Sequence, residues 1–165
     1  QNIVSTFLGM TAVLKDSNNS NDYKYEIIYS YNGLEWRKLR DIDNSSEVPI
    51  IQSDITGNII YSYKVVNESH YTIFKITSTG EYSEINVLNN VFTNIEGINY
   101  AGTEWLITGT LGGVNVIVKS YDAVRWRKPN IDTNNYPVIS SIVINGLNFL
   151  LNVLFINLIA LLLYK

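Results

Sequence analysis

Hydrophobic and polar residues alternate along much of this chain, and short polar turns interrupt the alternation. The clearest stretch predicts four short strands, at residues 97–101, 104–110, 114–120 and 124–128. Turn residues separate these strands at Gly102-Thr103, at Leu111-Gly112-Gly113 and at Asp122-Ala123. Within the third strand one face is purely Val, while the other still carries Ile117 beside polar residues. The pattern therefore predicts short β-strands whose sheets are covered on both faces.

A seven-residue segment of this pattern occurs twice. Residues Ser30 to Trp36 read Ser-Tyr-Asn-Gly-Leu-Glu-Trp, and residues Ser120 to Trp126 read Ser-Tyr-Asp-Ala-Val-Arg-Trp. Arg-Lys follows both copies. A degenerate copy from Thr77 to Tyr82 lies midway between them, with Gly80 at the turn and Tyr82 in place of Trp. The chain is therefore expected to be built from repeats.

A second series has the same period. Gly57, Gly102 and Gly146 each stand three residues before a large apolar residue, and they lie 45 and 44 residues apart. A weaker copy begins at Gly9. Together the two series predict a single β-repeat domain over residues 1–150, with units near 3–50, 51–95, 96–139 and 140–150, the last one partial. Four short strands in about 45 residues are typical of a β-propeller blade, so we expect an all-β, propeller-like array.

Composition agrees with this fold and excludes several functions. The chain is 46% hydrophobic and 16% charged, as in globular domains, and its 12 Tyr favour half-buried strands. The absence of Cys excludes disulfides and Cys-ligated metals. A formal net charge of -3 argues against nucleic-acid binding, which needs clustered Lys and Arg. A single His with no motif around it predicts no metal site, and no cofactor is expected.

The repeated segment has a structural explanation. Asn or Asp followed by Gly suits the positive-φ positions of a two-residue hairpin turn, and the Ser hydroxyl can add a further bond. The Trp three residues after Gly is expected to pack beside the hairpin. We therefore predict a set of structural motif residues: Ser30, Asn32, Gly33, Trp36, Gly80, Tyr82, Gly102, Trp105, Ser120, Asp122 and Trp126.

These segments resemble the Asp-box, or BNR, repeats of sialidase-like β-propellers, whose usual pattern is Ser-x-Asp-x-Gly-x-x-Trp. The spacing here is one residue shorter, because Gly33 follows Asn32 directly, and the later copy has Ala123 where the first has Gly33. A relaxed form of this kind is similar to propeller repeats in large DNA viruses and some bacteria. On that resemblance, the expected location is at a virion or a cell surface.

The resemblance implies a fold and not an activity. In the family the Asp-box lies at the periphery, away from the active centre. Catalytic sialidases need an arginine triad, a Tyr/Glu pair and an acid/base Asp, whereas all four arginines of this chain lie in or beside the repeated segments. We therefore predict no catalytic residue and a non-catalytic binding or structural module. The alternative is a fragment of a sialidase-like glycoside hydrolase or of a carbohydrate-binding propeller.

Two basic clusters follow the repeated Trp residues, and they have two interpretations. Their members are Arg37, Lys38, Arg40, Arg125, Arg127 and Lys128. They could form a binding rim for an anionic or glycan partner, or they could be the charges that keep an outer strand from pairing with another chain. A protein or glycan partner is expected under the first interpretation, and self-association could complete the array, since terminal repeats leave a face uncovered.

The C-terminal segment of the chain is strongly apolar. Residues 133–164 carry no charge, and residues 151–165 form an apolar tail ending at Lys165. Three interpretations follow: membrane contact, buried strands, or a helix that packs on the repeats. Asn152 and Asn157 would be costly in lipid, which favours the last two.

Overall fold

The computed structural model describes residues 2–6, 9–15, 24–129, 139–145 and 148–153. Every regular element in these residues is a β-strand, and the strands pair in antiparallel fashion. The prediction of an all-β protein is therefore confirmed. None of the described residues belongs to a helix long and apolar enough to cross a membrane. Residues 154–165, most of the apolar tail, lie outside the described residues.

The first sheet is a four-stranded meander, here called unit 1. Its strands are β1 (Asn2–Thr6), β2 (Gly9–Lys15), β3 (Tyr25–Ser30) and β4 (Arg37–Ile42), and they lie side by side in this order. The connection between β3 and β4 contains the first copy of the repeated segment. The strands of unit 1 thus run from Asn2 to Ile42, within the region where the sequence predicts a first repeat over residues 3–50.

The second sheet contains two further meanders. Unit 2 consists of β5 (Ile50–Ser53), β6 (Ile59–Lys64), β7 (Tyr71–Ile76) and β8 (Tyr82–Glu84). Unit 3 consists of β9 (Phe92–Tyr100), β10 (Trp105–Leu111) and β11 (Val114–Ser120). Only the pair Tyr71 and Phe92 joins the two units in the ladder. The strand predicted at residues 124–128 is reduced to an isolated bridge between Lys119 and Arg127.

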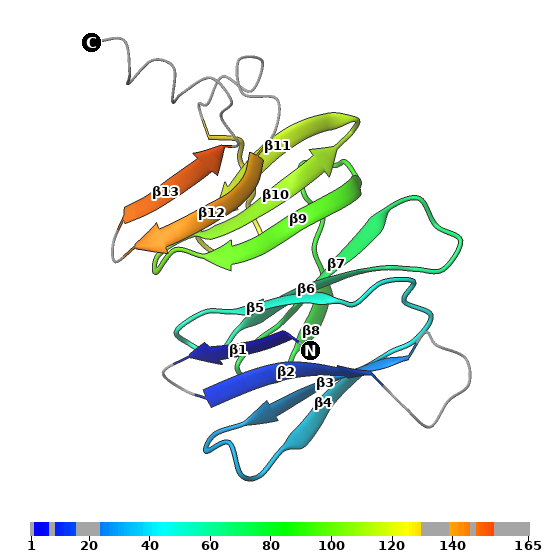
Figure 1. Cartoon of the computed structure of the whole chain (residues 1–165), viewed down its shortest axis with the longest axis vertical. Coiled ribbons are helices and arrows are strands. Elements are labelled where there is room, and N and C mark those ends of the chain that lie inside the picture. Colours follow the sequence, from blue (N-terminus) through cyan, green and yellow to red (C-terminus); the bar gives the residue numbers. More distant parts are fainter. Residues whose placement is uncertain (1, 7–8, 16–23, 130–138, 146–147, 154–165) are drawn as a thin grey trace.

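A two-stranded sheet follows unit 3, formed by β12 (Ile139–Asn145) and β13 (Asn148–Val153). Units 1, 2 and 3 follow one another from the bottom to the top of Figure 1, and β12 and β13 lie beside unit 3. The first strands of successive units are neighbours, because β5 lies against both β1 and β9, and β9 lies against β12. We call the face of a unit that is directed at the preceding unit its lower face, and the opposite face its upper face.

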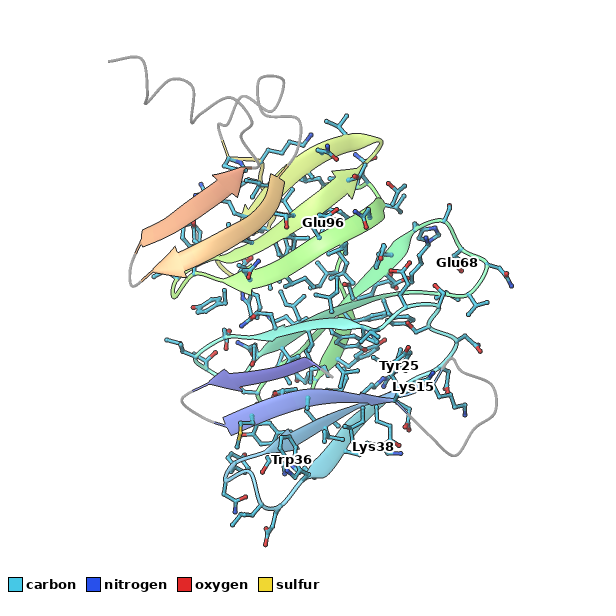
Figure 2. All side chains as sticks on the ribbon, viewed as in Figure 1. Lys15, Tyr25, Trp36, Lys38, Glu68 and Glu96 are labelled. Carbon is cyan, nitrogen blue, oxygen red and sulfur yellow. The ribbon has the colours of Figure 1, made fainter. Side chains whose placement is uncertain are left out.

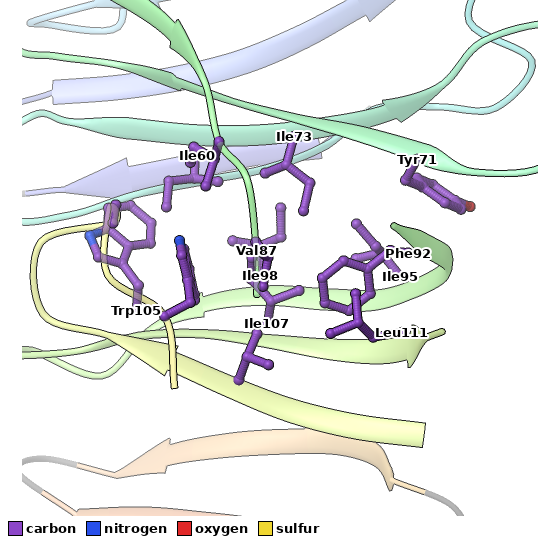
Figure 3. Close-up of a cluster of buried hydrophobic side chains, with 14 of the residues drawn as sticks. Ile60, Tyr71, Ile73, Val87, Phe92, Ile95, Ile98, Trp105, Ile107 and Leu111 are labelled. Atoms are coloured by element: carbon purple, nitrogen blue, oxygen red, sulfur yellow. The ribbon is translucent and has the colours of Figure 1, made fainter. Parts of the chain in front are cut away.

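Two hydrophobic cores lie between the units. One packs Val13 and Ile27 of unit 1 against Tyr61 and Phe74 of unit 2. The other packs the upper face of unit 2 against the lower face of unit 3 and contains Ile60, Ile73, Ile107 and Val118, among others (Figure 3). Adjacent residues Ile59 and Ile60 of β6 belong to different cores, as strand alternation requires of a sheet covered on both faces.

Strand pairing corrects the alignment of the middle repeat. Tyr29 pairs with Arg37 and Lys119 pairs with Arg127, which sets Ser30 against Trp36 and Ser120 against Trp126. In unit 2 the corresponding pair is Ile76 with Tyr82. The middle copy therefore begins at Ile76, one residue earlier than the sequence suggests. The sequence alignment places Thr77 opposite the Ser of the other copies because both side chains carry a hydroxyl group.

Candidate functional site

The repeated segments form the connections between the third and fourth strands of the units. In unit 1, Asn32 Oδ1 accepts hydrogen bonds from the backbone N–H groups of Leu34 at 2.9 Å and Glu35 at 3.0 Å. The Ser30 hydroxyl accepts one from Gly33 N–H at 2.9 Å. Gly33 has φ 75°, whereas Asn32 has an ordinary negative φ. The connection is thus a wide loop held by side chains, and the predicted two-residue hairpin turn is wrong.

The unit 3 copy repeats this scheme with a charged acceptor. Asp122 Oδ1 accepts hydrogen bonds from Val124 N–H and Arg125 N–H, both at 2.8 Å, and from the Ser120 hydroxyl at 2.9 Å. Ala123 occupies the position of Gly33 and adopts φ 60°, which an L-residue rarely does. The side-chain bonds therefore hold a loop conformation that the backbone of Ala123 alone would disfavour.

The hydrogen bonds from the backbone N–H groups of Arg125 and Val124 lower the pKa of Asp122 from 3.8 to about 2. A group whose pKa is lower in the folded state stabilises the fold at pH values above its unfolded pKa, and this stabilisation is lost as the pH falls through the folded pKa. Asp122 is exposed, so solvent weakens the effect. The pH window concerned runs from about 4 down to about 2.

We expect that the free energy of unfolding of the Asp122→Asn variant falls less steeply than that of wild type as the pH is lowered through this window. Asn32 shows that an amide oxygen can hold the same loop, so the variant keeps the bonds and loses the titration. Urea unfolding midpoints measured between pH 5 and pH 2.5 test this. The reciprocal Asn32→Asp variant is expected to steepen the decline, and equal slopes in wild type and both variants would contradict the assignment.

The predicted structural residues occupy different environments. Trp105 and Trp126 are buried in the core between units 2 and 3, whereas Trp36 is 39% exposed and donates from Nε1 to Gly33 O at 3.1 Å. Gly80 and Gly102 have φ 89° and 81°, in the left-handed region that favours glycine. The repeated Trp is therefore a core residue in unit 3 and a surface residue in unit 1.

An Arg and a Tyr are paired in both full copies of the segment. The Arg37 guanidinium lies 5.3 Å from the ring centroid of Tyr31, and the Arg127 guanidinium lies 5.0 Å from that of Tyr121. Such contacts contribute about 0.5–1 kcal/mol at exposed sites. Sequence reasoning missed the two Tyr, although both recur unchanged at a position where the turn itself requires no aromatic ring.

The six basic residues do not form one rim. Arg40 lies over the Tyr82 ring at 3.9 Å and so connects unit 1 with unit 2. Lys38 is paired with Asp41 at 3.0 Å and Glu26 at 3.5 Å. These two side chains have partners of their own, whereas Arg37 takes part in no salt bridge among the described residues.

In the unit 3 cluster, Arg127 is paired with a buried carboxylate. Lys119 lies 3.0 Å and Arg127 3.3 Å from Glu104 Oε1, and Glu104 is buried. Burial alone would raise the pKa of Glu104, but hydrogen bonds from Tyr121 and Lys119 and the charges of its partners lower it overall. Arg125 and Lys128 are exposed and have no salt bridge among the described residues.

A cleft of about 520 Å³ opens between unit 1 and unit 2, beside the first repeated segment. Unit 1 contributes Tyr29, Tyr31 and Arg37 to it, together with Lys38 and Leu39. The remaining wall comes from two loops of unit 2, residues 56–59 and 76–80, and includes four hydroxyl-bearing side chains: Thr56, Thr77, Ser78 and Thr79. The cleft thus combines aromatic rings, hydroxyl groups and a cation.

Arg37 is the centre of this cleft. Its guanidinium lies 5.3 Å from the ring centroids of both Tyr29 and Tyr31, and these rings meet edge to face at 4.7 Å. Burial and a hydrogen bond with Tyr31 raise the pKa of Tyr29, so its phenol stays protonated at neutral pH. The guanidinium is positioned by rings and retains donors for an anion.

The equivalent place between units 2 and 3 is filled. Strand pairing puts Lys75 where unit 1 has Tyr29, and Lys75 Nζ donates to Asp122 O in the next repeated segment at 2.8 Å. That bond joins the upper face of unit 2 to unit 3. In unit 1 this place is occupied by Tyr29, which lines the open cleft.

Among the described residues, no group of three or more His, Asp or Glu side chains could hold a metal ion. No protein-family model matches the chain, and no curated protein matches it in sequence. The resemblance to BNR repeats therefore depends on the quoted segments and their spacing alone.

Proposed function

We propose that this protein is a non-catalytic binding module and that the cleft between units 1 and 2 binds an anionic saccharide, one that carries a carboxylate or sulfate group. The observation that carries this proposal is the guanidinium of Arg37, which lies beside a pair of Tyr rings without a described carboxylate partner. Arg binds planar oxyanions through paired hydrogen bonds. Tyr rings provide apolar faces, and hydroxyl groups match those of a sugar.

We further propose that the units are blades of a BNR-like β-propeller. Three features support this assignment: the four-stranded meander of units 1 and 2, the contacts between the first strands of successive units, and the place of the repeated segment between third and fourth strands. In such an array, binding sites between adjacent units are formed by loops on a fixed scaffold.

Arg37→Gln is expected to weaken binding of a carboxylated or sulfated oligosaccharide at least tenfold. A hydrogen bond to a charged group contributes about 1.5–3 kcal/mol, and about 1.4 kcal/mol corresponds to a factor of ten. Titration calorimetry with a panel of acidic and neutral oligosaccharides measures this change. Affinity should also fall as salt is added, because charge attraction is screened.

Arg125→Gln is the matched control, since it removes the same charge from an exposed position of another unit. This variant should bind like wild type. Equal binding of acidic and neutral sugars, or an equal loss in both variants, would contradict the proposal.

A further inference from the structure

Unit 1 is the first unit of the stack, and among the described residues no other unit covers its lower face. Val13 and Ile27 contact unit 2, so their neighbours Ala12 and Ile28, which pair with each other, are directed to the opposite side. Met10 lies on the same side, because it pairs with Ser30 two positions further along. Figure 2 shows Trp36 at this end of the molecule, far from β12 and β13.

Strand pairing identifies the equivalents of this face in the other units. Met10 corresponds to Ile59 of unit 2 and Trp105 of unit 3, since each pairs with the last residue of the third strand of its unit. By the same register Ala12 corresponds to Tyr61 and Ile107, Ile28 to Phe74 and Val118, and Trp36 to Tyr82 and Trp126. Every unit therefore has an apolar lower face.

The burial of these equivalents differs between units. In unit 3, Trp105 is 2% and Val118 0% exposed against unit 2, and Trp126 is 8% exposed. In unit 1, Met10 and Ile28 are only half-buried, and Trp36 is 39% exposed. Tyr82, the unit 2 equivalent of Trp36, is also 39% exposed, and Ala12 is buried at 3%. The difference between the units therefore lies at Met10 and Ile28, whose equivalents Ile59 and Phe74 are only 3% and 8% exposed.

We infer that the lower face of unit 1 binds a second copy of this chain. The partner chemistry is given by the interfaces already present: twice within the molecule, such a lower face is covered by the upper face of a unit from this same sequence. Within each molecule the upper faces of units 1 and 2 are covered by the next unit, and β12 lies against unit 3. A second copy would therefore bring β12 and β13, the last described sheet of the stack, to this face and continue the stack in the same direction. Head-to-tail contacts of this type lead to rings or longer assemblies.

Charges limit how this contact can form. Lys38 pairs with Ile28 in the ladder and so lies on the lower face, where it is bound to Glu26 and Asp41. This small ion-paired group lies beside the apolar residues, as polar rims surround apolar interface cores. One ammonium group is shared by two carboxylates, so the group carries one net negative charge, which must stay at the solvent-exposed edge of a contact with a second copy.

The test is the concentration dependence of molecular mass, measured on the full chain by analytical ultracentrifugation. Wild type should be larger than the 18.7 kDa monomer at tens of micromolar. Trp36→Glu should raise the dissociation constant at least tenfold. Val114→Glu, which places the same charge at a 53% exposed residue of unit 3, should associate like wild type.

A second variant provides a readout that does not depend on the loss of Trp36. Leu34 is 85% exposed, and the chain has no Cys, so Leu34→Cys carries a single site for an environment-sensitive fluorophore. Its emission should shift to shorter wavelength as the concentration rises. The inference would be overturned if the wild-type chain stayed monomeric at every concentration. It would also be overturned if Trp36→Glu associated as strongly as wild type and the emission of the labelled Leu34→Cys chain did not shift.

Discussion

Replacing Gly109 by Ala is expected to lower the free energy of unfolding by about 3 kcal/mol. Gly109 lies in the middle of β10, where the pairing with β9 shifts register next to it. A Cβ at this position would lie 2.1 Å from the carbonyl oxygen of Asn94 and 3.0 Å from Ile95 Cα. Both are backbone atoms of a central strand, so the ladder itself must move to accept one methyl group.

Gly97→Ala is the control for this variant. Gly97 is on β9, opposite Thr108, and a Cβ there would meet only side-chain atoms, the nearest being Asn99 Nδ2 at 3.3 Å. This variant should change the free energy of unfolding by less than about 1 kcal/mol. Urea denaturation of both proteins measures the difference. Equal losses would show that loss of glycine, and not backbone collision, determines the effect.

Truncation of the two repeated Trp residues is expected to have unequal costs. Trp126→Ala should lower the free energy of unfolding by about 3–4 kcal/mol, because it opens a cavity in the core that units 2 and 3 share. Trp36→Ala should cost about 1 kcal/mol, mainly through the lost hydrogen bond to Gly33 O. Trp residues at equivalent positions of the two repeated segments would then differ severalfold in their effect on the free energy of unfolding.

Thermal unfolding, followed by circular dichroism, measures both variants under the same conditions. The samples should be dilute, so that a second copy does not stabilise Trp36 through association. Similar melting temperatures for the two variants would contradict the assignment of Trp36 to the surface and Trp126 to the core.

Much of the local structure could be predicted from sequence. The strand at residues 114–120 has the predicted bounds, and the units begin within a few residues of the predicted positions, because alternation and glycine turns are local properties. The sequence predicts a full fourth strand in unit 3 and does not reveal that only one bridge forms there. Its residues keep an apolar Trp, but only Arg127 reaches the ladder position opposite Lys119.

The candidate site was less accessible to sequence reasoning. The sequence places Arg37 in one basic cluster with Lys38 and Arg40. Which of the three side chains lines the cleft without an acidic partner depends on how the strands pair in the sheet. Leu39 lies at a register shift between β3 and β4, which allows Arg37 and Arg40 to share the upper face, whereas the Lys38 ammonium is bound to Glu26 and Asp41. A register shift of this kind involves pairing between strands, so no pattern within one strand reveals it.

The joining of the units has a consequence for how such chains change in evolution. No strand of unit 1 pairs with unit 2 in the described ladders, and only Tyr71 and Phe92 join units 2 and 3. The units are thus held together mainly by side-chain packing between similar apolar faces. Duplicating or deleting one whole unit would leave every other ladder intact, so gene rearrangements can lengthen or shorten this protein in steps of one repeat.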